Sequence, residues 1–313
     1  MTEKPHILVL SPWYAPAMGE LDRHFTVHRL WEAEDRDALL TSIAGCCVGI
    51  AGATVCDAAT MDALPQVKVI AHCGVGYDGI DVAAATARGI KVSNTPDVLS
   101  DEVADFAIAL TLATLRRIPQ GDRYVREGRW EREGNMPLAQ RMWGRSIGIL
   151  GLGRIGLEIA KRCEAFKMDI AYHNRGPRDV PYRYYDSLEV MAAAVDILVA
   201  IVPGGTGTRH LVNRDVLDAL GPTGVFINVA RGSVVDEAAL IAALEDRRLG
   251  AAGLDVFADE PRVPQALKDM TENVVLAPHQ ASATHETRLA MGRLVIENLL
   301  AGVAGKPLIT PVN

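Results

Sequence analysis

The chain has 313 residues, of which 49% are apolar and 23% charged, and a formal net charge of −7. This length is natural for two domains that each bury a hydrophobic core, and the composition is that of an ordinary globular protein. The acidic balance, without any dense run of Lys and Arg, argues against nucleic acid as a partner, because binding a phosphate backbone needs a basic face.

The sequence indicates neither a membrane nor a metal site. The best apolar run, Met191–Val202, is interrupted by Asp196 and is too short to span a bilayer. The first residues, MTEKPHILVL, pass directly into a β-run and lack the pattern of a signal peptide. We expect reduced thiols, no metal and a cytoplasmic location, because the cysteines are odd in number and have no zinc-like spacing. They are Cys46, Cys47, Cys56, Cys73 and Cys163.

The first hundred residues alternate short β-runs with helical stretches. Such alternation predicts a parallel sheet covered on both faces, here in a flavodoxin-like arrangement. The β-runs are His6–Leu10, Phe25–Leu30, Val48–Ala51, Val67–Ala71 and Ile90–Ser93.

A long apolar helix is predicted to follow, beginning at Ser100. The Ser100 hydroxyl can cap its first turn, and Arg116 suits the negative end of the helix dipole. Pro119 ends it.

The stretch Gln120–Arg145 has weak periodicity and carries Trp130 and Trp143. It is either a surface loop or an arm that embraces a second subunit. Exposed Trp favours the arm, because Trp is enriched at interfaces.

A second β/α series then predicts a Rossmann sheet of six strands. Its β-runs are Ser146–Leu150, Asp169–His173, Val195–Val202, Gly224–Val229, Ala251–Val256 and Val274–Ala277. The last helix, at about 286–300, can pack back on the first domain and make it discontinuous. We therefore expect a substrate domain at 1–99 and 288–313, and a dinucleotide-binding domain at 100–287.

The strongest single motif is Gly151-Leu152-Gly153-Arg154-Ile155-Gly156. It follows a strand and opens a helix, which is the context that a dinucleotide-binding turn requires. Gly151 allows the tight turn, Gly153 lets the pyrophosphate approach the backbone, and Gly156 lets the helix pack close to the strand. The alternative is a plain tight turn between a strand and a helix.

The second strand of this series ends in Tyr172-His173-Asn174-Arg175. A carboxylate normally stands here to bind the ribose hydroxyls of NAD. The neutral Asn174, followed by Arg175 and Arg178, suits a 2′-phosphate instead, because guanidinium groups offer forked donors. The pattern predicts NADP(H) over NAD(H), with NAD(H) use still open. The alternative is that both arginines are solvated loop charges.

Later loops carry polar residues where an α/β sheet places its ligand: NVARGSVVDE with Arg231, GLDVFADEP with Glu260, and VLAPHQASAT with His279. Together with GVGYDGIDV, NTPDVLSDEVAD and GLGRIG, these motifs resemble the D-2-hydroxyacid dehydrogenase family along nearly the whole chain. In its finer sequence details, especially YHNR, the chain resembles the glyoxylate/hydroxypyruvate reductase branch of this family.

The resemblance implies hydride transfer between a nicotinamide and a small 2-keto acid such as glyoxylate or hydroxypyruvate, giving the D-2-hydroxy acid. The residue types fit this chemistry independently. Arg231 can bind the substrate and polarise its carbonyl, His279 can supply the proton, and Glu260 can pair with His279. Individually, each could instead be a surface, turn or packing residue.

The resemblance also assigns substrate and cofactor contacts. Val75 and Gly76 match the loop whose N–H groups hold the substrate carboxylate, although a plain glycine turn would look the same. Ser282 is expected to reach the substrate. Asp255 matches the acceptor for the nicotinamide carboxamide; the alternative is a polar residue that closes a strand. Val202 and Pro203 are expected to line the adenine pocket, and Thr208 to touch phosphate. The match adds Arg154, Ile155, Ala230 and Ala281 to the cofactor site.

Rival functions stay open from sequence alone. A formate dehydrogenase of this family pairs its His with Gln, so Glu260 argues against that enzyme. Oxidation of phosphite or 3-phosphoglycerate, and a non-catalytic nucleotide sensor of the co-repressor kind, remain alternatives. Gln280 stands where many relatives carry an aliphatic residue, which leaves the preferred acid undetermined. The resemblance and the arm together predict a homodimer.

Overall fold

The computed structural model describes residues 3–313 and divides into two units. Unit 1 comprises the described part of Met1–Leu99 together with Ala283–Asn313, and unit 2 is Ser100–Ser282. The sequence placed the second division after residue 287, whereas the structure divides after Ser282. The physical reason is that α13 (His285–Val303) begins at His285 and belongs as a whole to unit 1.

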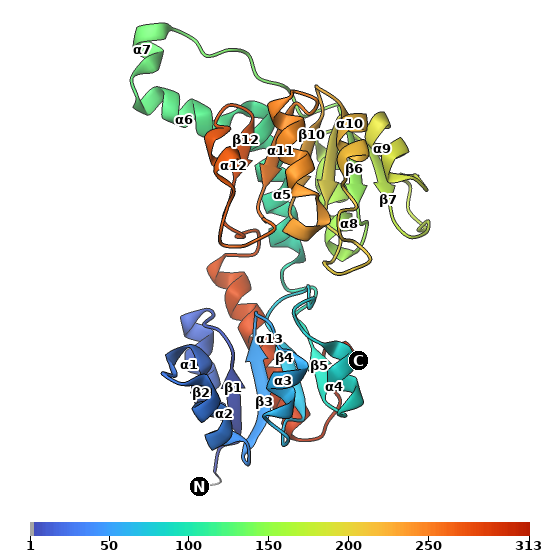
Figure 1. Cartoon of the computed structure of the whole chain (residues 1–313). Coiled ribbons are helices and arrows are strands. Elements are labelled where there is room, and N and C mark those ends of the chain that lie inside the picture. The colour runs from blue at the N-terminus through green and yellow to red at the C-terminus, as the bar shows by residue number, and fades with distance from the viewer. Residues whose placement is uncertain (1–2) are drawn as a thin grey trace. The chain divides into compact units, whose positions relative to one another are not determined.

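Unit 1 contains a five-stranded parallel sheet in the order β2-β1-β3-β4-β5, which is the flavodoxin-like arrangement expected from the sequence (Figure 1). Its strands are β1 (His6–Val9), β2 (Thr26–Arg29), β3 (Cys47–Gly52), β4 (Val69–His72) and β5 (Lys91–Ser93). Its helices before α13 are α1 (Ala15–His24), α2 (Arg36–Ile43), α3 (Ala58–Asp62) and α4 (Val82–Ala87), with a 3-10 turn at Leu30–Glu32.

Local sequence signals explain where the helices of unit 1 begin. Asp35, Asp57 and Asp81 accept backbone N–H groups at the starts of α2, α3 and α4. Helix α13 packs against the sheet, where a Cβ atom added at Gly302 would lie 2.5 Å from the Val69 Cβ. A glycine at this position therefore lets the C-terminal helix reach the central strands.

Unit 2 contains a seven-stranded parallel sheet in the order β12-β11-β10-β9-β6-β7-β8, the doubly wound order of dinucleotide-binding domains (Figure 1). Its strands are β6 (Ser146–Leu150), β7 (Asp169–His173), β8 (Arg183–Tyr184), β9 (Ile197–Ala200), β10 (Val225–Asn228), β11 (Ala251–Leu254) and β12 (Val274–Leu276). Six of these strands were expected. The seventh, β8, was missed because two residues at a sheet edge leave no hydrophobic pattern.

The helices of unit 2 cover this sheet, except for α6 and α7. They are α5 (Ser100–Arg116), α6 (Ile118–Arg126), α7 (Arg129–Glu133), α8 (Arg154–Ala165), α9 (Leu188–Ala194), α10 (Arg214–Leu220), α11 (Glu237–Glu245) and α12 (Gln265–Asp269), with a 3-10 turn at Gly232–Val234. Among residues 3–313, no helix is both long and apolar enough to cross a membrane.

Two details of the expected helix at Ser100 differ from the structure. Ser100 does not cap α5: its hydroxyl is buried and contacts no hydrogen-bond partner among the described residues. The helix ends at Arg116 because Arg117 adopts a left-handed conformation, with φ at 55°. Pro119 then occupies the first turn of α6, where its missing N–H is not needed.

The region after α5 is more ordered than a plain surface loop. Helices α6 and α7 stand apart from the sheet of their own unit, and an extended segment leads from them to β6 (Figure 1). Trp130 and Trp143 on this region are 58% and 57% exposed, and Leu138 is fully exposed. In the structure this region begins with α6 at Ile118, and from here on residues 118–143 are named the arm.

Candidate active site

The glycine-rich turn between β6 and α8 has the geometry of a dinucleotide-binding turn. Gly151 has φ at +104°, and a Cβ there would lie 2.9 Å from the Ile201 carbonyl oxygen. A Cβ at Gly156 would lie 2.3 Å from the Gly151 oxygen, so only glycine lets α8 start this close to the strand. Gly153 faces open space with nothing within 4 Å, which leaves its backbone accessible to a pyrophosphate. Arg154 and Ile155 form the first turn of α8, whose N–H groups suit an anion.

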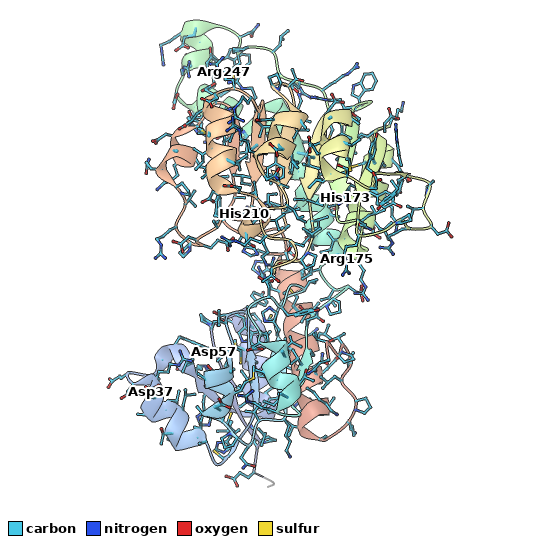
Figure 2. The ribbon with its side chains drawn as sticks, turned by 45° about the vertical axis from the view of Figure 1, so that its right-hand side comes forward. Asp37, Asp57, His173, Arg175, His210 and Arg247 are labelled. Carbon is cyan, nitrogen blue, oxygen red and sulfur yellow. The ribbon has the colours of Figure 1, made fainter. Side chains whose placement is uncertain are left out.

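The loop after β7 folds back on this turn. The Asn174 side-chain oxygen accepts the Leu152 N–H at 2.7 Å, and the Arg178 guanidinium donates to the Leu152 carbonyl oxygen at 2.5 Å. The Tyr172 hydroxyl holds the Arg178 backbone N–H at 2.8 Å. Arg175 is exposed, and Figure 2 shows it beside His173 in the loop that follows β7. Asn174 and Arg178 thus lie at the glycine turn, and Arg175 projects from the same loop.

The loop after β9 borders the glycine turn from the other side. A Cβ at Gly151 would lie 2.8 Å from Val202 Cγ1, which places Val202 against the turn, whereas Pro203 is exposed. The Thr208 hydroxyl donates to the carbonyl oxygens of Pro203 and Gly205, at 2.7 and 3.2 Å. The hydroxyl proton of Thr208 is therefore bonded within the loop. The sequence predicted a phosphate contact for Thr208 and did not predict this bond.

The loop after β10 positions Arg231 through a side chain that the sequence did not single out. Asn228 is fully buried at the end of β10; its amide donates to the Arg231 carbonyl and accepts the Ala230 N–H, both at 3.1 Å. Ala230 is buried. The Arg231 guanidinium donates to the Ala230 carbonyl at 2.7 Å. An Asn at a strand end, directly before the Arg motif, is the signal that could have revealed this support.

Gly232 brings two loops of the site together. A Cβ atom at this position would lie 1.9 Å from the carbonyl carbon of Phe257 and 2.4 Å from the Ala258 nitrogen. No side chain fits there, so glycine lets the loop after β10 press against the loop after β11. Arg231 is thereby held close enough for its charge to act on Glu260.

Glu260 and His279 form a hydrogen-bonded pair. His279 Nδ1 lies 2.6 Å from Glu260 Oε2, and the other carboxylate oxygen accepts the Phe257 N–H at 3.0 Å. Burial alone would raise the pKa of Glu260, but the hydrogen bonds from His279 and Phe257 and the charges of His279 and Arg231 lower it. Glu260 is therefore a carboxylate at neutral pH, and its hydrogen bond to Nδ1 fixes the His279 ring with Nε2 directed away from the pair.

His279 is held in an unusual backbone conformation by Asp255. His279 has φ at +50°, a left-handed value that costs energy for a residue with a Cβ. Its N–H donates to the Asp255 carbonyl at 2.8 Å. The Asp255 carboxylate accepts the N–H groups of Gln280 and Ala281 at 2.8 and 3.0 Å. Burial raises the pKa of Asp255, and these two N–H groups oppose the rise. Asp255 was expected only as a nicotinamide acceptor, yet its visible contacts hold the loop that carries His279.

Unit 1 carries the remaining predicted substrate residues. Val75 and Gly76 follow β4, and the Asn94 amide donates to the Val75 carbonyl at 2.8 Å. Within residues 3–313, no acceptor contacts the Val75 N–H, which leaves a backbone donor at the carboxyl end of the sheet. Cys73, just before this loop, is buried, and burial raises the pKa of its thiol to about 11, so it is not a nucleophile near neutral pH.

The structure thus collects the predicted residues at the carboxyl edges of the two sheets. Unit 2 holds the glycine turn, Arg231, Glu260 and His279, with Ser282 as its last residue, and unit 1 holds the Val75 loop. Among residues 3–313, no group of three or more His, Cys, Asp or Glu side chains could hold a metal ion. The arrangement in unit 2 combines a cation, a fixed proton donor and a dinucleotide-binding turn, which together suit the reduction of a carbonyl group.

Comparisons with known proteins agree with this geometry. Residues 108–281 match the model of the D-isomer specific 2-hydroxyacid dehydrogenase NAD-binding domain. The chain is 46% identical to a hydroxyphenylpyruvate reductase of Plectranthus scutellarioides, with 98% of each chain covered. It is 42% identical to a 2-ketogluconate reductase of Gluconobacter oxydans, with full coverage of both.

The comparison with solved structures leads to the same family. The NADPH-dependent glyoxylate/hydroxypyruvate reductase of Sinorhizobium meliloti, solved with NADP and malonate, superposes with a TM-score of 0.94 at 49% identity. That match covers 99% of this chain and 97% of the other. The chain therefore belongs to the D-isomer-specific 2-hydroxyacid dehydrogenase family.

Proposed function

We propose that this chain reduces a small 2-keto acid, such as glyoxylate or hydroxypyruvate, to the D-2-hydroxy acid with NADPH, and that it can catalyse the reverse reaction. The observation that carries the proposal is the pair of His279 Nδ1 and Glu260 Oε2, 2.6 Å apart. It lies in the unit that also holds Arg231 and the dinucleotide-binding turn. A nicotinamide bound at that turn supplies the hydride that forms the new C–H bond at C2 of the substrate.

The side chains of the chain handle charge and protons in this reaction. Arg231 binds the substrate and polarises the C2 carbonyl, so that the developing oxyanion meets a positive charge. His279 donates the proton from Nε2 to that oxygen, which completes the hydroxyl group. Glu260 keeps its negative charge throughout and stabilises the imidazolium before the transfer. Val75 and Gly76 are proposed to donate backbone N–H groups to the substrate carboxylate.

The preference for NADPH rests on the loop after β7. This loop has the uncharged Asn174 directly after β7, with Arg175 exposed and Arg178 at the glycine turn, and so offers positive charge there. A 2′-phosphate would be attracted by this arrangement, because Arg side chains bind phosphate through forked N–H donors. The Sinorhizobium meliloti relative was solved with NADP, which supports the same preference.

Initial rates test the proposal directly. NADPH and NADH oxidation would be followed in parallel with glyoxylate, hydroxypyruvate, pyruvate and phenylpyruvate. We expect fast NADPH-linked turnover of the first two acids, weaker NADH-linked turnover, and loss of turnover in His279→Ala with NADPH binding retained. Tight NADPH binding without turnover of any acid would instead favour the nucleotide-sensor alternative, and full activity of His279→Ala would remove His279 from the mechanism.

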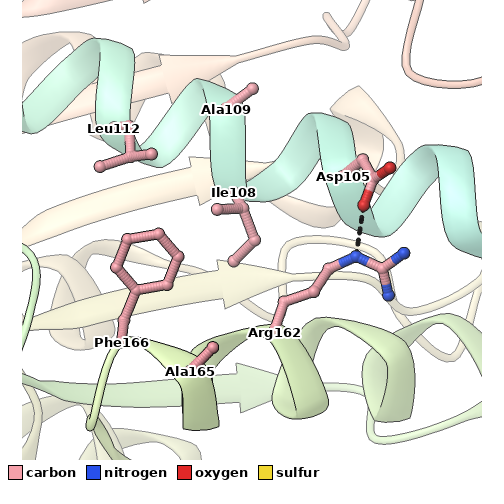
Figure 3. A pocket seen from close by; sticks show the side chains of 7 residues that line it. All are labelled: Asp105, Ile108, Ala109, Leu112, Arg162, Ala165 and Phe166. Carbon is pink, nitrogen blue, oxygen red and sulfur yellow. Dashed lines mark hydrogen bonds and ion pairs between the residues drawn. The ribbon is translucent and has the colours of Figure 1, made fainter.

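We also propose that the protein is a homodimer. Trp130, Trp143 and Leu138 expose apolar side chains on the arm. In the same unit, Ile108, Leu112 and Phe166 line an apolar hollow between α5 and α8, next to the ion pair of Asp105 with Arg162 (Figure 3). A second copy of this chain would cover such surfaces. Light scattering should give twice the mass of one chain, and a monomer at micromolar concentration would contradict the proposal.

A cytoplasmic location is proposed from the cysteines. All five are free, including the exposed Cys46, and burial raises the pKa of the Cys56 and Cys163 thiols to about 12. Free thiols persist in a reducing compartment. Cell fractionation with a cytoplasmic marker checks this, and co-purification with an extracellular or membrane fraction would refute it.

A further inference from the structure

The substrates of the named relatives have the same carboxylate at C1 and keto group at C2, and they differ beyond C2. A hydroxyphenylpyruvate reductase and a 2-ketogluconate reductase are both close to this chain, at 46% and 42% identity. Arg231, His279 and the Val75 loop deal only with the carboxylate and the keto group that all these acids possess. Selection among the acids must therefore depend on other residues.

A hydrogen-bonded pair stands at the carboxyl edge of the unit 1 sheet, outside the residues used so far. The Tyr14 hydroxyl lies 2.9 Å from His285 Nδ1, and the two ring centroids are 5.6 Å apart. Tyr14 is the residue directly before α1, in the loop after β1, and His285 is the first residue of α13. Tyr14 is half-buried and His285 is exposed, so the pair is accessible from solution.

Close helix packing holds this pair in place. A Cβ at Gly292 of α13 would lie 2.3 Å from the Ala17 Cβ and 3.0 Å from the Trp13 ring, so α1 and α13 approach at the minimum distance. Further along, Arg293 donates to the Glu20 carboxylate at 2.8 Å. A polar pair fixed between two packed helices loses little conformational entropy on binding a ligand.

The pair also lies on the same sheet edge as the proposed carboxylate loop. β1 and β4 are separated only by β3, so their ends are about 10 Å apart at the usual strand spacing. The intervening loops are in contact: Ala53 N–H donates to the Ser11 hydroxyl, and Cys73 N–H to the Gly52 carbonyl. Glyoxylate has two carbons and cannot span two strand spacings, whereas a six-carbon acid with a hydrogen bond at each end can.

The chemistry of the pair suits a hydroxyl group. One proton is shared between the Tyr14 oxygen and His285 Nδ1, and the pair keeps a further N–H or O–H to donate and a lone pair to accept. A sugar-acid hydroxyl is itself both a donor and an acceptor, whereas an alkyl chain would leave the pair's polar groups unsatisfied.

From this geometry we propose that Tyr14 and His285 form a specificity site for the distal hydroxyl groups of a polyhydroxylated 2-keto acid. The physiological substrate class is then the 2-keto aldonic acids rather than glyoxylate alone. This inference rests on the proposed function, since it concerns the same substrate.

The test compares two six-carbon acids that differ in hydroxylation, 2-ketogluconate and 2-ketohexanoate, with glyoxylate as the reference that has no atom beyond C2. In the wild-type protein, kcat/KM should be higher for 2-ketogluconate than for 2-ketohexanoate. Tyr14→Phe and His285→Asn should each lower this ratio by about tenfold, mainly through KM, because each removes one hydrogen bond to the substrate. Tyr182→Phe is the matched control: it removes a phenol that donates to Glu164 on unit 2, at 2.8 Å, and should not change the ratio.

The outcomes separate the inference from the function on which it rests. An equal loss of kcat/KM for all three acids would show that the pair only supports the fold, and an unchanged ratio would show that the pair does not contact the substrate. Either result overturns the inference. Glyoxylate reduction by the wild type would still uphold the proposed function. No turnover of any 2-keto acid by the wild type would overturn both. Thermal unfolding of each variant shows whether it folds. If Tyr14→Phe does not fold, His285→Asn alone tests the inference.

Discussion

Replacing Glu260 by Gln should move the pH dependence of reduction. His279 donates the proton as an imidazolium, and the lowered pKa of Glu260 keeps a negative charge beside the ring down to acidic pH. Glutamine has no charge, and its amide N–H can donate to Nδ1, which favours the neutral ring. The alkaline limb of kcat/KM should therefore shift to lower pH.

The size of the shift follows from the distance and the exposure of the pair. At 2.6 Å two unit charges attract each other by about 1.6 kcal/mol in a medium as polar as water. The side chains of His279 and Glu260 are 46% and 32% exposed, so the solvent-screened value is the appropriate one. This energy corresponds to a shift of about one pH unit.

The assay is the rate of NADPH oxidation with glyoxylate from pH 5 to pH 10, under conditions that give kcat/KM. Asp259→Asn is a matched control, because it removes a neighbouring carboxylate that pairs with Arg262 at 2.8 Å rather than with His279. The control should keep the wild-type profile. An alkaline limb that stays in place in Glu260→Gln, or that moves equally in Asp259→Asn, would refute the reasoning.

Three further predictions test the loops around this pair. Gly232→Ala places a Cβ 2.0 Å from the Phe257 carbonyl oxygen, so it should lower the free energy of unfolding by more than about 4 kcal/mol or prevent folding. Gly19→Ala is the control and should be tolerated, because open space surrounds Gly19. A stable, active Gly232→Ala protein would contradict this prediction. Because burial raises the pKa of Asp255 above its ordinary 3.8, the folded state binds the proton more tightly than the unfolded state, so this residue's contribution to stability falls as pH rises from about 3.8 through the raised value. Asp255→Asn should lack this slope in denaturant unfolding between pH 3.5 and pH 7, and a slope equal to that of the wild type would show that Asp255 does not cause it. Arg175→Ala combined with Arg178→Ala should weaken NADPH binding more than NADH binding in fluorescence titrations; equal losses would mean that these arginines do not bind the 2′-phosphate.

Much of the fold could be predicted because its signals are local. Apolar β-runs alternating with helical stretches indicated eleven of the twelve strands found in residues 3–313, and the glycines placed the Gly151 turn between a strand and a helix. The missed strand, Arg183–Tyr184, is too short to carry a pattern, and the expected cap at Ser100 was wrong because that hydroxyl is buried away from any partner. Capping propensity is a local tendency that burial overrides.

The supports of the site were less visible because they depend on contacts between distant segments. Asn228 and Gly232 stand in the NVARGSVVDE motif, but only the fold shows that they hold Arg231 beside the loop after β11. In the sequence, Asp255 looks like an ordinary acidic residue at the end of a strand. Only the fold shows that its carboxylate accepts hydrogen bonds from the N–H groups of Gln280 and Ala281. The pair of Tyr14 and His285 joins residues 271 positions apart, so no local pattern could predict it.

The sequence by itself predicted the two α/β units and the glycine-rich turn, and it singled out Arg231, Glu260 and His279 as candidates, because residue type, glycine spacing and hydrophobic period are properties of neighbouring residues. Only the tertiary structure decided that His279 and Glu260 meet at 2.6 Å, that His279 is held with φ at +50°, and that Tyr14 pairs with His285. These contacts exist because parallel strands bring their carboxyl ends to one edge, where loops far apart in the chain become neighbours.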